Sequence, residues 1–141
     1  MTGETDLQRL LATMRPVLNP GEYVFCSTTE ATAIPPQLVL GSFREPEGLT
    51  LIVAREVADS FGLPYGHLMA WLTLTVHSSL AAVGLTAAVA GALTKEDISC
   101  NVVAAYYHDH LFVSHAAADR ALGVLQRLWE EAAGSAAAAA E

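Results

Sequence analysis

The chain has 141 residues, the size of one compact domain or of two small units that share a core. Its 15 acidic and 7 basic residues give a formal net charge of −8, which disfavours nucleic acid and anionic membrane surfaces as partners. Hydrophobic residues make up 52% and charged residues 16%, which excludes a disordered acidic segment. So little charge leaves apolar surface that a monomer has trouble hiding, and we expect a homodimer.

Signals for export or membrane insertion are not visible. The first ten residues lack a basic start followed by an apolar run, and the longest mostly apolar stretch, 80–93, is shorter than the ~20 residues that cross a bilayer. The two cysteines, Cys26 and Cys100, are too few and too far apart for a disulfide framework. These features predict a soluble cytoplasmic protein.

The first half of the chain predicts a helix, three strands and a short helix. The first helix is indicated by apolar residues at helical spacing: Leu7, Leu10, Leu11 and Met14. A turn is expected at Asn19-Pro20-Gly21. Strands are then expected at 22–29, 37–43 and 49–53, the last two as a hairpin. A helix from about Arg55 to Phe61 follows, with Gly62 at its end.

The second half predicts the order strand, helix, strand, strand, helix. Apolar and polar residues alternate over 69–76, which places Ala70, Leu72 and Leu74 on one face and Trp71 and Thr73 on the other. A helix is expected from Ser78 or Ser79 to Leu93, strands at 98–107 and 111–113 with a hairpin turn at 108–110, and a helix over 118–131 that the Ala-rich end extends. With a right-handed crossover, this order predicts an α+β fold with helices packed on one face of an antiparallel sheet.

Three motifs of the second half occur together in one known family. Val83-Gly84-Leu85-Thr86 opens a helix, Ile98-Ser99-Cys100-Asn101-Val102 forms a strand, and Tyr107-His108-Asp109 precedes the last strand. In this order the motifs resemble the small-ligand-binding ACT domain. The upstream segment 43–53 is similar to the one that precedes such a unit in tandem ACT proteins, which include arginine sensors and the regulatory part of aspartate kinases. The whole resembles a group of small, stand-alone bacterial ACT proteins.

The resemblance implies ferredoxin-like βαββαβ units: an N-terminal, partial or permuted unit over 1–66, a C-terminal unit over 67–133, and an Ala-rich tail over 134–141. It also implies a non-catalytic regulatory module that binds a small molecule, an amino acid, at an interface between units and without a cofactor or metal. The residues that it assigns to the ligand are Ser78, Ser79, Val83, Gly84, Leu85, Thr86, Cys100, Asn101, Val102, His108 and Asp109.

The chemistry of these residues suits a zwitterion. Free N–H groups at a helix start bind a carboxylate, and Ser78 or Ser79 could add hydroxyl donors. Gly84 lets a ligand approach the backbone closely. Asp109, or alternatively the upstream Glu45 and Glu47, could bind the ammonium group. The plainer interpretation is that the serines only cap the helix and that Gly84 only permits packing.

Two other functions stay open. His108, Asp109 and His110, with His115, could bind a divalent metal in a small enzyme, because strand alternation places His108 and His110 on the same side. A polar hairpin tip is the plainer interpretation of that segment. A purely structural oligomerisation domain is the third alternative. Trp71 and Trp129 are interpreted as core or interface aromatics.

Overall fold

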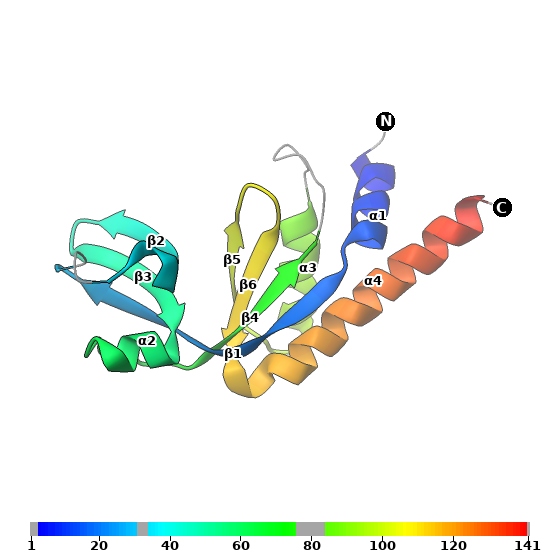
Figure 1. The fold of residues 1–141 in the computed structure, drawn as a ribbon. Helices are drawn as coiled ribbons and strands as arrows, with labels where there is room; N and C mark the ends of the chain where they lie inside the picture. Colours follow the sequence, from blue (N-terminus) through cyan, green and yellow to red (C-terminus); the bar gives the residue numbers. More distant parts are fainter. Residues whose placement is uncertain (1–2, 31–33, 76–83, 141) are drawn as a thin grey trace.

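The computed structural model describes residues 3–30, 34–75 and 84–140, and its elements are shown in Figure 1. In chain order they are α1 (Gly3–Thr13), β1 (Pro16–Thr28), the 3-10 helix η2 (Pro36–Leu38), β2 (Val39–Glu45), β3 (Gly48–Ala54), α2 (Arg55–Ser60), β4 (Met69–Leu74), α3 (Leu85–Lys95), β5 (Cys100–Ala104), β6 (Asp109–Ser114), the 3-10 helix η3 (His115–Ala117) and α4 (Ala118–Ala140). The predicted α+β class is confirmed.

A single sheet of six strands, in the order β2-β3-β1-β4-β6-β5, joins the two halves of the chain. All of its neighbouring strands are antiparallel. The long strand β1 holds the sheet together, because it pairs with β3 through 23–28 and with β4 mainly through 16–19. Figure 1 shows that the sheet curls, so that the β2–β3 hairpin and the β5–β6 hairpin rise on either side of one face.

The turn predicted at Asn19-Pro20-Gly21 is wrong, because these residues lie within β1. The register between β1 and β4 shifts between Asn19 and Tyr23, which marks an irregularity in the ladder. Pro20 has no N–H to donate, and Gly21 takes a φ of 106° that side chains with a Cβ rarely adopt. The residues that signal a turn therefore bend a continuous strand.

Two apolar clusters lie on the helix-bearing face of the sheet. The larger one packs α1, α3 and α4 against β4, β5 and β6, and its largest fully buried members are Met14, Leu72, Leu74, Leu93, Leu111 and Leu125. The smaller one lies between α2, β1 and β3 and contains Val24, Cys26, Ile34, Leu51, Val53 and Ala58. The predicted alternation in β4 is confirmed, since Ala70, Leu72 and Leu74 all belong to the larger cluster.

The N-terminal helix packs against the C-terminal one. Trp129 of α4 donates a hydrogen bond from Nε1 to the carbonyl oxygen of Ala12, at 2.9 Å. Leu11 and Met14 are buried in the same cluster as Ala121 and Leu125. The first and last elements of the chain therefore stabilise one common core. No helix in the described part of the chain combines the length and the apolar character needed to cross a membrane.

Two predicted boundaries in the second half are wrong. Helix α3 begins at Leu85, because Gly84 before it has a left-handed backbone with φ of 96°, which a continuous α-helix cannot include. The hairpin turn lies at 105–108, where Ala105 donates its N–H to the carbonyl oxygen of His108. Asp109 and His110 already belong to β6 and pair with Leu74 and Thr73 of β4.

Candidate functional site

The predicted ligand site centres on the start of α3. Ser78, Ser79 and Val83 lie outside the described residues. Gly84 is the N-cap of α3 and makes no side-chain capping bond, so the first-turn N–H groups receive no side-chain acceptor from this position. Thr86 is exposed on that first turn, whereas Leu85 is 3% exposed and belongs to the core.

The described environment of Gly84 includes helix α1. A Cβ placed on Gly84 would meet Leu7 Cδ2 at 3.5 Å, which is ordinary van der Waals contact. Leu7 thus covers one side of the helix start. The positive φ, and not a lack of space, is what favours glycine at this position.

The predicted strand residues divide between the two faces of β5. Cys100 and Val102 pack against the larger core on the helix-bearing face, and Asn101 between them is exposed on the opposite face. Burial raises the pKa of the Cys100 thiol, so this cysteine stays protonated at neutral pH. Ala104 pairs with Asp109 and Cys100 pairs with Val113, so Cys100 lies about 13 Å along the strand from the Asp109 end.

His108 and Asp109 lie at the same end of the sheet as the start of α3. Both are half-buried at the junction of the 105–108 turn with β6. Figure 1 shows this turn and the first turn of α3 at the same end of the sheet. Because side chains alternate along β6, Asp109 faces the helices as Leu111 does. The structure therefore brings Gly84, Thr86, His108 and Asp109 to one end of the sheet and leaves Cys100 at the other.

The alternative sites are dispersed in the described structure. Glu45 accepts a hydrogen bond from the Thr50 hydroxyl within the β2–β3 hairpin, at the opposite edge of the sheet from β5. His115 lies beside the start of β4, where its backbone N–H donates to the carbonyl oxygen of Leu68. In the described ranges, no three His, Cys, Asp or Glu side chains come together as a metal site would require.

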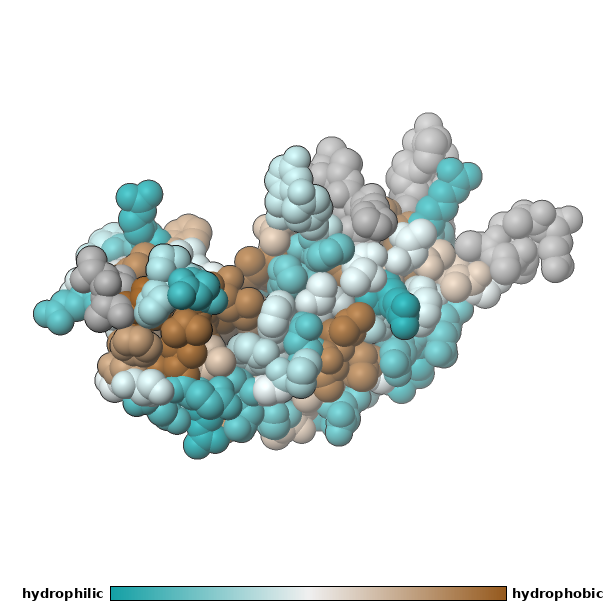
Figure 2. Space-filling view, in the orientation of Figure 1, coloured by the Kyte–Doolittle hydropathy of each residue, from teal (hydrophilic) through white to brown (hydrophobic). Residues whose placement is uncertain are grey.

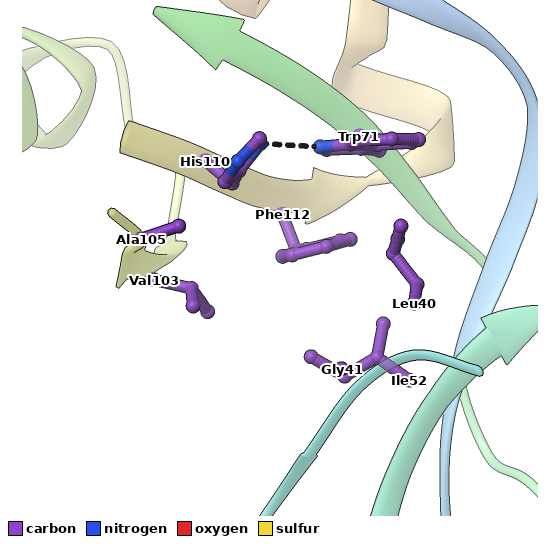
Figure 3. A pocket seen from close by; sticks show the side chains of 8 residues that line it. All are labelled: Leu40, Gly41, Ile52, Trp71, Val103, Ala105, His110 and Phe112. Atoms are coloured by element: carbon purple, nitrogen blue, oxygen red, sulfur yellow. Dashed lines mark hydrogen bonds between the residues drawn. The ribbon is translucent and has the colours of Figure 1, made fainter. Parts of the chain in front are cut away.

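A cleft on the helix-free face of the sheet is a site that the sequence did not predict. The curl of the sheet brings both outer strands to it, and its volume is about 110 Å³ (Figure 3). Its lining residues come from every strand except β1 and from the turn after β5: Leu40, Gly41, Ile52, Trp71, Val103, Ala105, His110 and Phe112. Figure 2 shows hydrophobic residues gathered in the hollow between the two raised hairpins.

Aromatic rings form the floor of this cleft. Phe112 is 2% exposed and lies parallel to Trp71, with ring centroids 6.5 Å apart and an interplanar angle of 14°. Phe25 packs edge-on against Phe112, and Tyr23 packs edge-on against Trp71, each at 5.3 Å between centroids. Each of these rings therefore packs against another ring, and together they form the aromatic floor of the cleft.

A chain of hydrogen bonds fixes the polar end of the cleft. Asn19 donates from Nδ2 to the Thr73 hydroxyl at 2.9 Å, and the Thr73 oxygen lies 3.1 Å from His110 Nδ1. Trp71 Nε1 also lies 3.0 Å from His110 Nδ1 (Figure 3). An indole N–H can only donate, so Nδ1 must be the acceptor and the proton of the neutral imidazole is on Nε2.

The surroundings of His110 favour its neutral form. Burial lowers its pKa below the ordinary value of 6.5, and the nearby His108 acts in the same direction, while Asp109 opposes both. The hydrogen bond from Trp71 is consistent with a lowered pKa of His110, because a protonated Nδ1 could not accept it.

The cleft was hard to find in the sequence because its residues are far apart along the chain. The usable signal is alternation: in three strands, Tyr23 with Phe25, Trp71 with Thr73, and His110 with Phe112 alternate with residues that pack toward the helices. A strand face that carries aromatic residues instead of charged ones indicates a second buried or binding surface. Trp71 was interpreted only as a core or interface residue.

Two models of one family match the chain in succession. The first, described as an ACT domain, matches residues 2–70, and the second, also described as an ACT domain, matches residues 69–127. Together they cover both halves of the six-stranded sheet. A comparison with curated proteins finds no match.

Solved structures with the same arrangement include one of high sequence identity. A protein of unknown function from Vibrio cholerae, described as a possible transport protein, is 46% identical over 91% of this chain and 99% of its own, with a TM-score of 0.81. A protein from Agrobacterium tumefaciens is 17% identical over 82% of this chain and 89% of its own, with a TM-score of 0.61. The regulatory subunit of aspartate kinase from Thermus flavus is 9% identical over 83% of this chain and 99% of its own, with a TM-score of 0.56, and shares the fold.

Proposed function

Because the chain belongs to the ACT-domain family, as a tandem ACT protein, we propose that it is a non-catalytic regulatory module that binds an amino acid. The family supports a regulatory, small-molecule-binding role. The amino acid and the absence of catalysis are our additions to that role. We also place the module in the cytoplasm, and the unpaired thiols of Cys26 and Cys100 support a reducing compartment.

The arrangement at the start of α3 carries this proposal. Gly84 at the N-cap has no side chain that could accept a hydrogen bond from the first-turn N–H groups, and the helix dipole adds a partial positive charge there. Asp109 supplies a carboxylate at the same end of the sheet (Figure 1). An amino acid has the complementary charges, so its carboxylate would bind the helix start and its ammonium group would bind Asp109.

A regulatory signal requires that the ligand binds two arrangements of the protein with different affinity. We infer that the two arrangements are those of a homodimer in which sheets join side by side. Strand β5 is an outer strand of the sheet, and its sequence Cys-Asn-Val-Val-Ala contains no charged residue. An uncharged outer strand offers unpaired backbone groups to a second copy.

Isothermal titration of the full chain with each of the twenty amino acids tests the ligand. We expect saturable binding of one amino acid or a few related ones, weakened at least tenfold by Asp109→Asn because a charge-assisted contact is lost. Asp119→Asn, which changes an exposed carboxylate in the first turn of α4, is the matched control and should bind as the wild type does. If none of the twenty amino acids gives a heat of binding at millimolar concentration, the proposal is contradicted.

Sedimentation equilibrium tests the dimer. Asn101→Lys places a charge on the exposed edge strand and should shift the protein from dimer to monomer. Gln126→Lys adds the same charge on an exposed position of α4 and should leave the dimer intact. A wild-type protein that is monomeric at all concentrations contradicts the side-by-side arrangement.

The two remaining alternatives make different predictions. A small metal-dependent enzyme would hold stoichiometric zinc or manganese after purification and would lose it in His110→Ala. A purely structural oligomerisation domain would assemble normally and show no dependence on any ligand. Metal analysis by mass spectrometry and sedimentation with and without amino acids separate both from a regulatory module.

A further inference from the structure

The helix-free cleft differs in chemistry from the predicted amino-acid site. No charged side chain is among the residues that line it, and besides Trp71 and His110 its walls and floor consist of aliphatic residues, a glycine and a phenylalanine: Leu40, Gly41, Ile52, Val103, Ala105 and Phe112. Leu40 and Val103 are each 40% exposed, so the cleft is open to a molecule from solution. An ammonium or carboxylate group drawn into these walls would lose its hydration without gaining a partner.

One directed donor remains at the polar end. His110 accepts on Nδ1 from Trp71, which places the remaining ring proton on Nε2. Among the described residues, no hydrogen-bond acceptor is found for this Nε2–H, while the ring itself lines the cleft (Figure 3). The Asn19–Thr73 chain behind it holds the imidazole in place. The cleft thus pairs an apolar body with a single fixed donor, as small-molecule sites commonly do.

The volume limits the size of the group that the cleft encloses. A cavity of ~150 Å³ lined by apolar side chains holds benzene. The cleft has about 110 Å³, so it matches a branched group of about four carbons and leaves the rest of a ligand at the open mouth.

From these observations we propose that the helix-free cleft is a second binding site, separate from the start of α3, for a small uncharged molecule. The molecule carries a branched aliphatic group, which packs between Leu40 and Val103 over Phe112, and one carbonyl oxygen, which accepts the hydrogen bond from His110 Nε2. This site does not depend on the amino-acid proposal, because it uses other residues and the opposite face of the sheet.

Three probes with similar isobutyl groups test the proposal: isovaleramide, which is uncharged, isovalerate, which is an anion, and leucine, which is a zwitterion. The readout is the indole N–H resonance of Trp71 in the full chain, which Trp129→Phe identifies by removing the other indole signal. We expect a saturable shift with isovaleramide, together with a shift of the His110 Nε2 resonance. Isovalerate and leucine should bind this site at least tenfold more weakly.

Gly41→Val is the variant that fills the cleft. A Cβ at Gly41 meets only Ile52, at 3.4 Å from Cδ1, and no positive φ opposes the substitution, so the strand can accept valine. Isovaleramide binding should fall at least tenfold. Phe61→Ala, which removes a residue of similar exposure (39%) at the end of α2, should leave it unchanged. Circular dichroism of both variants confirms that they are folded.

Four results overturn the proposal: no Trp71 shift with isovaleramide at 10 mM, equal affinity for all three probes, undiminished binding by folded Gly41→Val, or a Trp71 shift that follows protein concentration in the absence of probe. The last result would show that a second copy occupies the cleft. Leucine could bind without shifting the Trp71 resonance, and this binding could be lost in Asp109→Asn. That result would support the amino-acid site alone, so the two proposals can fail separately.

Discussion

Trp71 and His110 lie on adjacent strands, β4 and β6, two residues apart in register, and the indole N–H of one points at the Nδ1 of the other at 3.0 Å. The direct partners in the ladder are Trp71 with Phe112 and Thr73 with His110, so this contact is diagonal across the sheet. Because this hydrogen bond requires an unprotonated Nδ1, the packing of the helix-free face depends on the protonation state of His110.

Acid should weaken the fold through His110. Its pKa is lowered in the folded protein, so the unfolded chain binds more protons as the pH falls through 6.5. The free energy of unfolding therefore decreases from about pH 7.5 downward, and this loss is complete below the folded-state pKa. Urea unfolding at pH 7.5 and 5.5 measures it, and NMR titration of His110 should give a midpoint below 6.5.

The matched variants for this test are His110→Gln and His67→Gln. His110→Gln removes the titrating group and should reduce the difference in stability between the two pH values. His67 is exposed and precedes β4, so His67→Gln should retain the wild-type difference. An unchanged pH dependence in His110→Gln would show that other groups dominate.

The contact between the two ends of the chain should also be measurable. Trp129→Phe keeps an aromatic ring but removes the donor to the carbonyl oxygen of Ala12. We expect a loss of about 1 kcal/mol in the free energy of unfolding, since one partly buried hydrogen bond is lost. Tyr107→Phe, at a side chain on the β5–β6 turn that is 74% exposed, is the control and should change stability by less than ~0.5 kcal/mol. Equal losses of stability in Trp129→Phe and Tyr107→Phe would show that the loss does not come from the packing of α1 against α4.

The sequence predicted the fold best where one physical pattern dominates. Alternation over 69–76 correctly places Leu72 and Leu74 in the core. This pattern is reliable because one face of β4 packs entirely against the helix-side core. The hairpin predicted from the strands at 37–43 and 49–53 is also confirmed, since β2 pairs antiparallel with β3.

The errors arose where local signals compete with pairing. Asn19-Pro20-Gly21 signals a turn, yet the flanking residues of β1 pair with β4 on one side and with β3 on the other, so the strand continues. The predicted helix includes Gly84 because its neighbours favour a helix, although Gly84 takes a left-handed conformation and α3 begins after it. Alternation indicates the aromatic face, but the two walls of the cleft cannot be predicted, because Leu40 and Val103 come together only through the curl of the sheet.

The two glycines of the α3 region give opposite predictions for the same substitution. Gly84 has φ of 96°, which an alanine adopts only with strain, whereas Gly91 lies inside α3 and a Cβ there meets nothing within 4 Å. Gly84→Ala should lower the free energy of unfolding by about 1–2 kcal/mol. Gly91→Ala should raise it by about 0.5–1 kcal/mol, because alanine is the better helix former.

Urea unfolding of both variants beside the wild type measures the two effects under one condition. The same substitution adds the same methyl group in both cases, so a difference in sign isolates the backbone conformation from hydrophobic burial. If Gly84→Ala were as stable as the wild type, α3 would begin earlier than Leu85, and the amides proposed to bind the ligand carboxylate would belong to a helix interior. The result at Gly84 therefore tests the geometry on which the amino-acid site depends, before any ligand is known.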